Sequence, residues 1–240
     1  MARYYDKIYH WKDYEKDVDF LERIFKKHGL KVEDILDVAC GTGGHAATLV
    51  KRGYKVVGVD LNKEMLKIAR RKVQDAAFVK GDMRDFKLAR TFDAVICMFS
   101  SITYNRTLSE LKKTLSGFHN HLKAKGIVVF DIHFLRERFA HGQRGVTGYD
   151  SDELTIARFY LSEKLGRTGK ITFSYLIREG NAFNYIRGDV HELGLFSLSE
   201  IIGAMREAGF TAEVYWNFTM RRPPKRIKSL ENFVFVGVKK

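Results

Sequence analysis

The segment Ile35-Leu36-Asp37-Val38-Ala39-Cys40-Gly41-Thr42-Gly43 decides the fold, because it joins an apolar run directly to a glycine-rich turn. Residues 35–39 are typical of a short buried strand, and residues 45–52 continue with helical spacing up to Gly53. Glycines let a backbone turn tightly and approach a ligand closely, and the start of a helix offers free N–H groups. The segment therefore predicts a strand, a ligand-binding loop and a helix in succession.

Strands and helices alternate through the first half of the chain. Apolar periodicity predicts helices at 14–28, 62–73 and 109–123, and strands at 56–60, 77–79, 92–98 and 127–131. Asn62 is a suitable N-cap for the second of these helices. Such alternation is typical of a parallel sheet with helices on both faces.

The pattern changes after about Gly142. Alternating apolar and polar residues predict a three-stranded antiparallel meander at 154–162, 170–178 and 182–192. A capping box of Ser197 and Glu200 then begins a helix that runs to residue 208, and strands at 211–217 and 232–238 complete the sheet.

These elements predict an α/β fold: a Rossmann-like, seven-stranded, mostly parallel sheet with helices on both faces and an inserted antiparallel β lid. We expect one domain over residues 1–240, with a core at 30–142 and 195–240 and the lid at about 150–194. With 240 residues and 45% hydrophobic content, the chain can bury a sizeable core, which excludes disordered and collagen-like classes.

Composition also bears on localisation and metal binding. The chain has no long uncharged apolar stretch, and its first residues lack the apolar region of a signal peptide. Its two cysteines, Cys40 and Cys97, are too few for a disulfide framework or a zinc site. We therefore expect a soluble, cytoplasmic protein without a membrane association or a bound metal.

The charge is strongly basic and uneven. Lysine and arginine exceed the acidic residues by 42 − 29 = +13, and the stretch 221–240 carries a large part of this excess. A basic domain attracts anions such as nucleic acid or nucleotide-linked substrates. A solvated, lysine-rich surface explains the same composition, so both interpretations stay open.

Three acidic residues surround the glycine loop in sequence. Asp60 ends the second strand, where a carboxylate can accept hydrogen bonds from ribose hydroxyls. Asp82 follows the third strand and could accept from an adenine amino group, while Asp37 lies inside the first strand, where a buried carboxylate needs a partner. Together they favour a cationic, adenosine-bearing ligand over a pyrophosphate. Because NAD enzymes share the acid at the second strand, an NAD-binding protein is the alternative.

These motifs resemble those of a known family. Residues 35–43, 56–60 and Met65-Leu66 are similar to the cofactor motifs of class I S-adenosylmethionine-dependent methyltransferases. Three further segments, 81–86, 98–102 and 178–180, resemble the dTDP-3-amino-sugar N,N-dimethyltransferases of macrolide sugar biosynthesis. The resemblance extends over nearly the whole chain, including the antiparallel insertion.

The resemblance implies a site for S-adenosylmethionine, with S-adenosylhomocysteine as the product. It places Gly41 and Gly43 at the methionine part of the cofactor, Asp60 at the ribose, and Asp82 with Met83 at the adenine. The remaining implied cofactor contacts are two N-terminal tyrosines that close over the cofactor and several residues near the strand ends: Tyr5, Tyr14, Asp37, Ala39, Thr42, Leu61, Met65, Met98 and Ser100.

The predicted function is methyl transfer to a small-molecule acceptor, an amine or a hydroxyl. A hydroxyl acceptor would need a general base, for which His133 and Tyr104 are the candidates; the resemblance places Tyr104 opposite the transferred methyl group. An RNA methyltransferase that uses the basic loop Arg221–Lys228 is the alternative, disfavoured because that loop lacks aromatic residues for stacking bases. A homodimer through the strand edges of the insertion is also possible.

Overall fold

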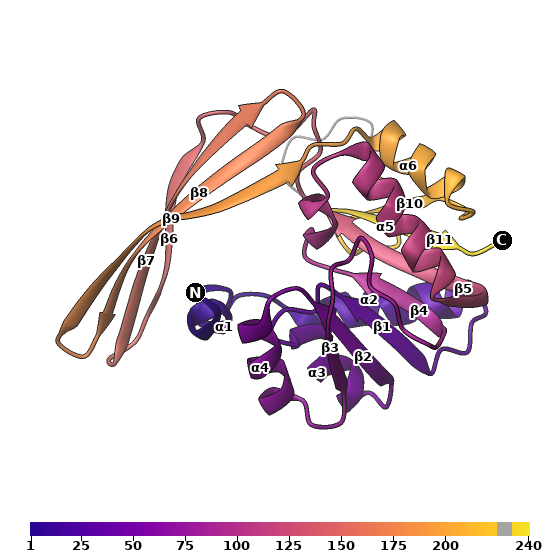
Figure 1. Ribbon diagram of the computed structural model, residues 1–240, viewed down its shortest axis with the longest axis horizontal. Helices are drawn as coiled ribbons and strands as arrows, with labels where there is room; N and C mark the ends of the chain where they lie inside the picture. Colours follow the sequence, from indigo (N-terminus) through magenta and orange to yellow (C-terminus); the bar gives the residue numbers. More distant parts are fainter. Residues whose placement is uncertain (225–231) are drawn as a thin grey trace.

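The computed structural model describes residues 1–224 and 232–240 and confirms the predicted α/β core (Figure 1). Seven strands build its main sheet: β1 (Asp34–Val38), β2 (Lys55–Asp60), β3 (Ala77–Lys80), β4 (Phe92–Cys97), β5 (Leu122–Ile132), β10 (Glu213–Trp216) and β11 (Phe233–Val238). Their order is β10-β11-β5-β4-β1-β2-β3. All neighbours from β5 to β3 are parallel, and β11 runs antiparallel to β5 and β10. The order reverses between β1 and β4, which is where open α/β sheets bind ligands.

Helices cover both faces of this sheet. One face carries α2 (Tyr14–Lys27), α3 (Gly44–Lys51) and α4 (Lys63–Lys72), and the other carries α5 (Leu108–Asn120) and α6 (Leu198–Glu207). Neighbouring residues of β1 point to opposite faces: Ile35 packs in the first core cluster and Leu36 in the second, both fully buried. Burial on both faces explains why the parallel strands are continuous apolar runs in the sequence.

The helix starts follow the predicted caps. The Asn62 side chain accepts the backbone N–H groups of Glu64 and Met65 at the start of α4. The predicted capping box of Ser197 and Glu200 begins α6. Three short helical segments complete this part of the chain: η1 (Ala2–Tyr4), α1 (Tyr5–Ile8) and η2 (Ser101–Tyr104).

The insertion differs from the prediction, because it holds four strands instead of three. They are β6 (Arg144–Asp150), β7 (Leu154–Leu165), β8 (Thr168–Glu179) and β9 (Ala182–Gly194), paired in that order in one antiparallel sheet. This sheet, called the lid below, projects from the core as a long arm (Figure 1). The sequence of β6, RGVTGYD, contains two glycines and mostly exposed side chains. It therefore lacks the apolar alternation that predicts a strand.

The boundary between α5 and β5 also differs. The helix ends at Asn120 and β5 begins at Leu122, where we predicted a helix to 123 and a strand from 127. Leu122 pairs with Phe92, and the register then shifts so that Ala94 faces Ile127. Because the register shifts at the start of the strand, its first residues do not alternate regularly between apolar and polar, and the sequence pattern does not reveal them.

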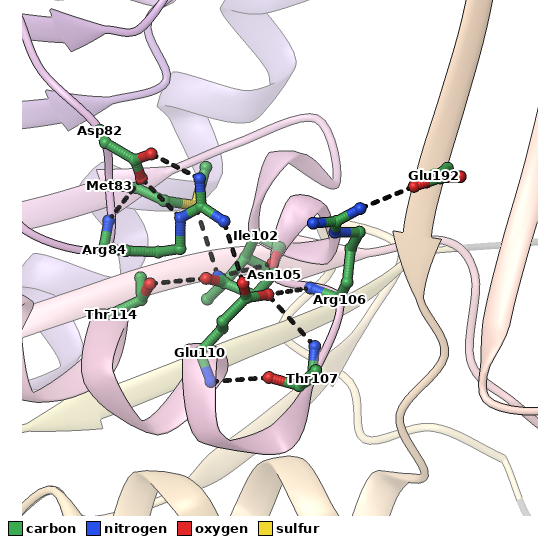
Figure 2. Close-up of polar contacts among 10 residues, drawn as sticks. All are labelled: Asp82, Met83, Arg84, Ile102, Asn105, Arg106, Thr107, Glu110, Thr114 and Glu192. Atoms are coloured by element: carbon green, nitrogen blue, oxygen red, sulfur yellow. Dashed lines mark hydrogen bonds and ion pairs between the residues drawn. The ribbon is translucent and has the colours of Figure 1, made fainter.

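The lid meets the core at the end of β9. A Cβ atom at Gly194 would lie 2.1 Å from the backbone oxygen of Asn105, directly after η2, so glycine permits this close approach. Arg106 Nη1 bonds Glu192 Oε2 of β9 at 2.8 Å across the same junction (Figure 2). The N-terminal segment packs on the lid as well, since Tyr4 and Ile8 share an apolar cluster with lid residues.

Two predictions concern surface properties. Of the basic loop Arg221–Lys228, the structure describes residues 221–224, and the rest lies outside the described residues. Among the residues that the structure does describe, no helix is both long enough and apolar enough to cross a membrane.

Candidate active site

The glycine loop after β1 forms the centre of the candidate site. Gly41 and Gly43 have φ values of 56° and 77°, in the left-handed region that favours glycine, and Ala39 has a φ of 58°. Asp60, at the end of β2, accepts the Gly41 N–H at 2.8 Å through Oδ2 and the Asn62 N–H at 2.8 Å through Oδ1. Asp60 therefore braces the loop, a role that the sequence reasoning missed. Each carboxylate oxygen keeps a lone pair for a further donor.

Asp37 lies beside this loop with an unsatisfied carboxylate. It is 1% exposed, and its Oδ2 has no hydrogen-bond partner among the residues that the structure describes. Burial, and then the charge of Asp60, raise the pKa of Asp37 to about 8. A buried carboxylate oxygen without a donor is costly, and a cationic ligand would remove that cost. The loop and its two acids therefore fit the ammonium and ribose groups of S-adenosylmethionine.

The N-terminal segment reaches the same loop. Thr42 Oγ1 donates to Asp6 Oδ1 at 2.6 Å, so the Thr42 hydroxyl ties the loop to α1. The Tyr5 ring lies 4.7 Å from the Tyr9 ring, centroid to centroid. Burial, followed by the neighbouring Tyr9, raises the pKa of Tyr5. Tyr5 directly precedes Asp6, which bonds the loop, so Tyr5 lies close to the loop. This placement suits the predicted cover over a cofactor.

Tyr14 is placed differently from Tyr5. Its ring packs edge-on against His45 with centroids 4.9 Å apart, and a Cβ atom at Gly44 would lie 2.3 Å from the Tyr14 Cζ. The lack of a side chain at residue 44 therefore makes room for the tyrosine at the start of α3. Tyr14 contacts the helix that follows the loop, and its predicted contact with the cofactor stays a prediction.

Arg84 organises the loop after β3 (Figure 2). Asp82 Oδ1 accepts the Arg84 backbone N–H at 2.9 Å and its Nε at 2.8 Å, and Arg84 lowers the pKa of Asp82. Arg84 Nη1 also bonds Glu110 at 3.0 Å, while the Met83 sulfur accepts from Asn105 Nδ2 at 3.4 Å. Sequence reasoning missed this arginine, whose nearness to Asp82 was the available signal. The adenine contacts of Asp82 and Met83 stay predictions.

The residues after β4 have an unusual backbone. Phe99 and Ser100 both have a φ of 60°, which is uncommon outside glycine. Ser100 Oγ accepts the His133 backbone N–H at 2.8 Å and lies 3.4 Å from Asp131 Oδ2. Met98 is 2% exposed and packs in the core. The side chains of residues 98 and 100 are thus engaged within the protein, and their predicted contacts with the cofactor stay predictions.

Leu61 and Met65 flank the start of α4. Leu61 is 60% exposed directly after Asp60, and Met65 is half-buried one helical turn later. Both side chains are at least partly exposed, and their predicted contacts with the cofactor stay predictions.

The two candidate bases lie in different settings. His133 Nδ1 is 3.0 Å from Asn232 Oδ1, and burial, followed by the charge of Arg138, lowers the pKa of His133. Its imidazole is therefore neutral at pH 7. Tyr104 is 45% exposed and ends η2, which follows β4. Because β4 and β1 are parallel neighbours, Tyr104 lies at the same strand ends as the glycine loop, called the cofactor edge of the core below. Partial loss of hydration raises the pKa of Tyr104.

Tyr104 also bonds the lid. Its Oη lies 2.5 Å from His191 Nδ1 on β9, and His191 Nε2 lies 3.5 Å from Asp189 Oδ1. Tyr175 of β8 donates to the other oxygen of Asp189 at 3.0 Å. His191 lowers the pKa of Asp189. A phenol, an imidazole and a carboxylate therefore follow one another from the core into the lid, and sequence reasoning missed both lid members.

Comparison with known proteins identifies the family of the chain. Residues 35–126 match the family described as a methyltransferase domain. The chain is 34% identical over 215 residues to the dTDP-3-amino-3,6-dideoxy-alpha-D-glucopyranose N,N-dimethyltransferase of Streptomyces fradiae, covering 89% of this chain and 84% of that protein.

Solved structures share the whole architecture. DesVI of Streptomyces venezuelae is 32% identical with a TM-score of 0.87, covering 100% of this chain and 98% of its own. CalS10, an amino pentose methyltransferase from Micromonospora echinaspora with S-adenosylmethionine bound, is 27% identical with a TM-score of 0.81, covering 95% and 92%. The chain therefore belongs to the class I S-adenosylmethionine-dependent methyltransferases, in the group that contains the dTDP-amino-sugar N,N-dimethyltransferases.

Proposed function

We propose that this methyltransferase methylates a primary or secondary amine of a small molecule, with amino sugars as the first acceptor class to test. The S. fradiae relative and CalS10 are both named for amino-sugar acceptors. The observation that carries the proposal is the chain Tyr104–His191–Asp189, which begins at the cofactor edge of the core. It offers a route for the proton that a methylated amine must lose.

The cofactor half of the site positions the donor. S-adenosylmethionine, when bound, supplies a methyl group on a sulfonium sulfur, which an acceptor lone pair can attack in line. Asp37 would pair with its ammonium group and Asp60 with its ribose, while Gly41 allows close backbone approach. Tyr5, next in sequence to the Asp6 that bonds Thr42, would exclude water from the reacting atoms.

The proton route assigns a task to each side chain. With His191 protonated on Nε2, facing Asp189, its Nδ1 accepts the Tyr104 hydroxyl proton. A Tyr104 Oη lone pair then remains to accept an N–H from the acceptor. As the C–N bond forms and the C–S bond breaks, the ammonium proton passes to Tyr104 Oη, and the phenol proton passes to His191. Asp189 stabilises the imidazolium that results.

The same arrangement favours an amine over a hydroxyl. Because its pKa is raised, Tyr104 stays a neutral phenol at neutral pH and cannot by itself deprotonate a hydroxyl acceptor, which must lose its proton as it attacks. A neutral amine attacks through its own lone pair, and its N–H becomes acidic only after the methyl group has been transferred.

Mass spectrometry of the products tests the proposal. The full chain would be incubated with S-adenosylmethionine and amino sugars, free and as phosphates, beside matched sugars with a hydroxyl in place of the amine. Mass gains on the amines alone support it, and mass gains on the hydroxyl sugars alone would refute it. Calorimetry with S-adenosylhomocysteine, and with NAD as control, checks the cofactor half separately.

A further inference from the structure

Lys12, between α1 and α2, is a nearly buried lysine with no task in the proposed methyl transfer. Its side chain is 8% exposed, and its ammonium group pairs with Asp17 of α2, whose side chain is 2% exposed. Asp17 Oδ2 also lies 2.9 Å from Nε2 of His45, the second residue of α3 after the glycine loop. A buried ion pair often stabilises a fold no better than apolar residues would, because both charges lose their hydration. The pair does fix the ammonium group at one place.

Two aromatic rings lie close to this ammonium group. Lys12 Nζ is 5.3 Å from the ring centroid of Phe99 and 5.2 Å from that of Phe218. Phe99 follows β4 and Phe218 follows β10, and these two strands end at the same edge of the sheet because both run parallel to β5. A cation attracts the faces of aromatic rings, and most strongly where water is excluded. Lys12 therefore joins two strand ends that are far apart in sequence.

Both phenylalanines belong to bends with an uncommon backbone. Phe99 and Ser100 each have a φ of 60°, and Asn217 and Phe218 have φ values of 45° and 56°. These two bends hold four of the six non-glycine residues with a positive φ in the described part of the chain. Residues in this region persist only where their surroundings compensate for the energy. One cation in contact with both rings supplies such compensation to both bends.

The first bend leads directly to Tyr104. Ser100 immediately precedes η2, and its carbonyl oxygen accepts the N–H of Thr103 at 3.0 Å and the Thr103 hydroxyl at 2.7 Å. Tyr104 is the next residue and ends η2. Because these bonds join the bend to η2, a shift of Phe99 and Ser100 changes the position of the Tyr104 hydroxyl.

We propose that Lys12 is a positioning residue, which holds both bends in place and thereby fixes the Tyr104 hydroxyl for turnover. Its effect on turnover rests on the proposed function, because that function gives Tyr104 its task. Its effect on the two bends does not. The donor half of the site should change little without Lys12, since Asp60 keeps its bond to the Gly41 N–H.

Hydrogen exchange measures the two bends without methyl transfer. The full chain, saturated with S-adenosylhomocysteine, would be compared with Lys12→Met, which keeps the length of the side chain and removes its charge. Amide exchange in residues 99–104 and 217–219 should become at least about fivefold faster, while exchange in β8 of the lid stays unchanged. Lys16→Met, at an exposed position of α2, is the matched control and should exchange as the wild type does.

A second variant separates the charge from the fold. Lys12→Gln can still donate a hydrogen bond to Asp17 but carries no charge, so it should speed exchange in the same two bends. Unchanged exchange in both bends, or faster exchange throughout the chain in both variants, overturns the inference.

A double-mutant cycle with Tyr104 measures the effect on turnover. With an amine that the wild type methylates, Lys12→Met should lower kcat about tenfold and leave the affinity for S-adenosylhomocysteine within about twofold. In a Tyr104→Phe background the same change should have almost no further effect, because the hydroxyl that Lys12 positions is absent. Losses that multiply, or a loss of S-adenosylhomocysteine affinity equal to the loss of turnover, would each contradict the positioning role.

The proposed function and this inference fail in different ways. If no amine is methylated, or if Tyr104→Phe turns over as fast as the wild type, the proposed function or its proton route is refuted, and hydrogen exchange still decides whether Lys12 holds the bends. Full turnover by Lys12→Met would instead overturn the inference and leave amine methylation intact.

Discussion

The cofactor edge of the core and its junction with the lid are built in different ways. At the cofactor edge, a glycine loop lies beside two carboxylates from the neighbouring strands β1 and β2, and Asp60 accepts the Gly41 N–H. At the junction, side chains far apart in sequence meet: Tyr104 and His191 are 87 residues apart. If the proposed roles hold, donor binding depends on contacts that are local in sequence and acceptor turnover on the contact with the lid, so we expect the two to be separable.

The largest effect on turnover is expected from a substitution that breaks the junction at Tyr104. Tyr104→Phe keeps the ring and removes the hydroxyl that bonds His191, so turnover should fall about 100-fold while the affinity for S-adenosylhomocysteine is unchanged. Steady-state kinetics and calorimetry measure the two quantities. Tyr54→Phe, whose hydroxyl bonds Glu22 away from the site, should change neither. A loss of cofactor affinity in the Tyr104 variant would show that the two regions are not separable.

The matching change at the cofactor edge is Asp60→Ala. It removes the acceptor for the Gly41 N–H and for a ribose hydroxyl, and should cost about 1–3 kcal/mol of affinity for S-adenosylhomocysteine. Asp93→Ala is the control. Asp93 also accepts two backbone N–H groups, those of Glu33 and Asp34, but it lies at the amino-terminal ends of the strands, opposite the glycine loop. Calorimetry should find the cofactor affinity of the Asp93 variant unchanged, and equal losses in both variants would argue against a specific role of Asp60.

The pH dependence of cofactor binding sharpens the role of Asp37. Because its pKa is raised to about 8, its carboxyl group is neutral below that pH and pairs less well with an ammonium group. The affinity for S-adenosylhomocysteine should therefore rise, by about tenfold in all, from pH 6 to pH 8 and then level off. Asp37→Asn should flatten the profile, and a flat wild-type profile would contradict the assignment.

Asp37 should affect folding in the opposite sense. A carboxyl group with a raised pKa binds its proton more tightly in the folded state than in the unfolded state. Without a cofactor, its contribution to the free energy of unfolding therefore decreases as the pH rises from its ordinary range to about 8. Chemical denaturation at several pH values should show this decrease in the wild type and less of it in Asp37→Asn.

The smallest expected effect concerns the surface of the junction. The Arg106–Glu192 ion pair joins core and lid, but both side chains are about half exposed, so solvent screens their attraction. Arg106→Gln should change the free energy of unfolding by less than about 1 kcal/mol and turnover only slightly. A large loss of turnover, measured beside the Tyr104 variant, would mean that the ion pair rather than Gly194 sets the position of the lid.

The core was predictable because its signals are local. The strand, glycine loop and helix at residues 35–52 are neighbours in sequence, and Asp60 ends the next strand at a position that parallel topology brings beside the loop. The resemblance added Tyr5 and Tyr104, whose contacts with the cofactor and the acceptor stay predictions.

The junction was less predictable, because its contacts depend on the register of long antiparallel strands. His191 and Asp189 lie two residues apart on β9, and nothing local distinguishes them from other polar residues of an exposed strand. Arg158 is a charged residue in an alternating strand, where sequence pattern predicts solvent exposure, yet packing around Tyr9 and Phe173 buries it. Similarly, β6 has hydrogen-bond partners on β7 but no apolar period of its own.

The backbone of Phe99 and Ser100 bears on how this enzyme could be engineered. Two successive non-glycine residues in the left-handed region raise the energy of the native chain, and the bond from the His133 N–H to Ser100 Oγ helps to hold Ser100 there. A glycine at either position would lower the energy of the native backbone and raise the melting temperature. It would also loosen the segment that connects Ser100 with Tyr104, so thermostability and catalytic efficiency compete at this bend.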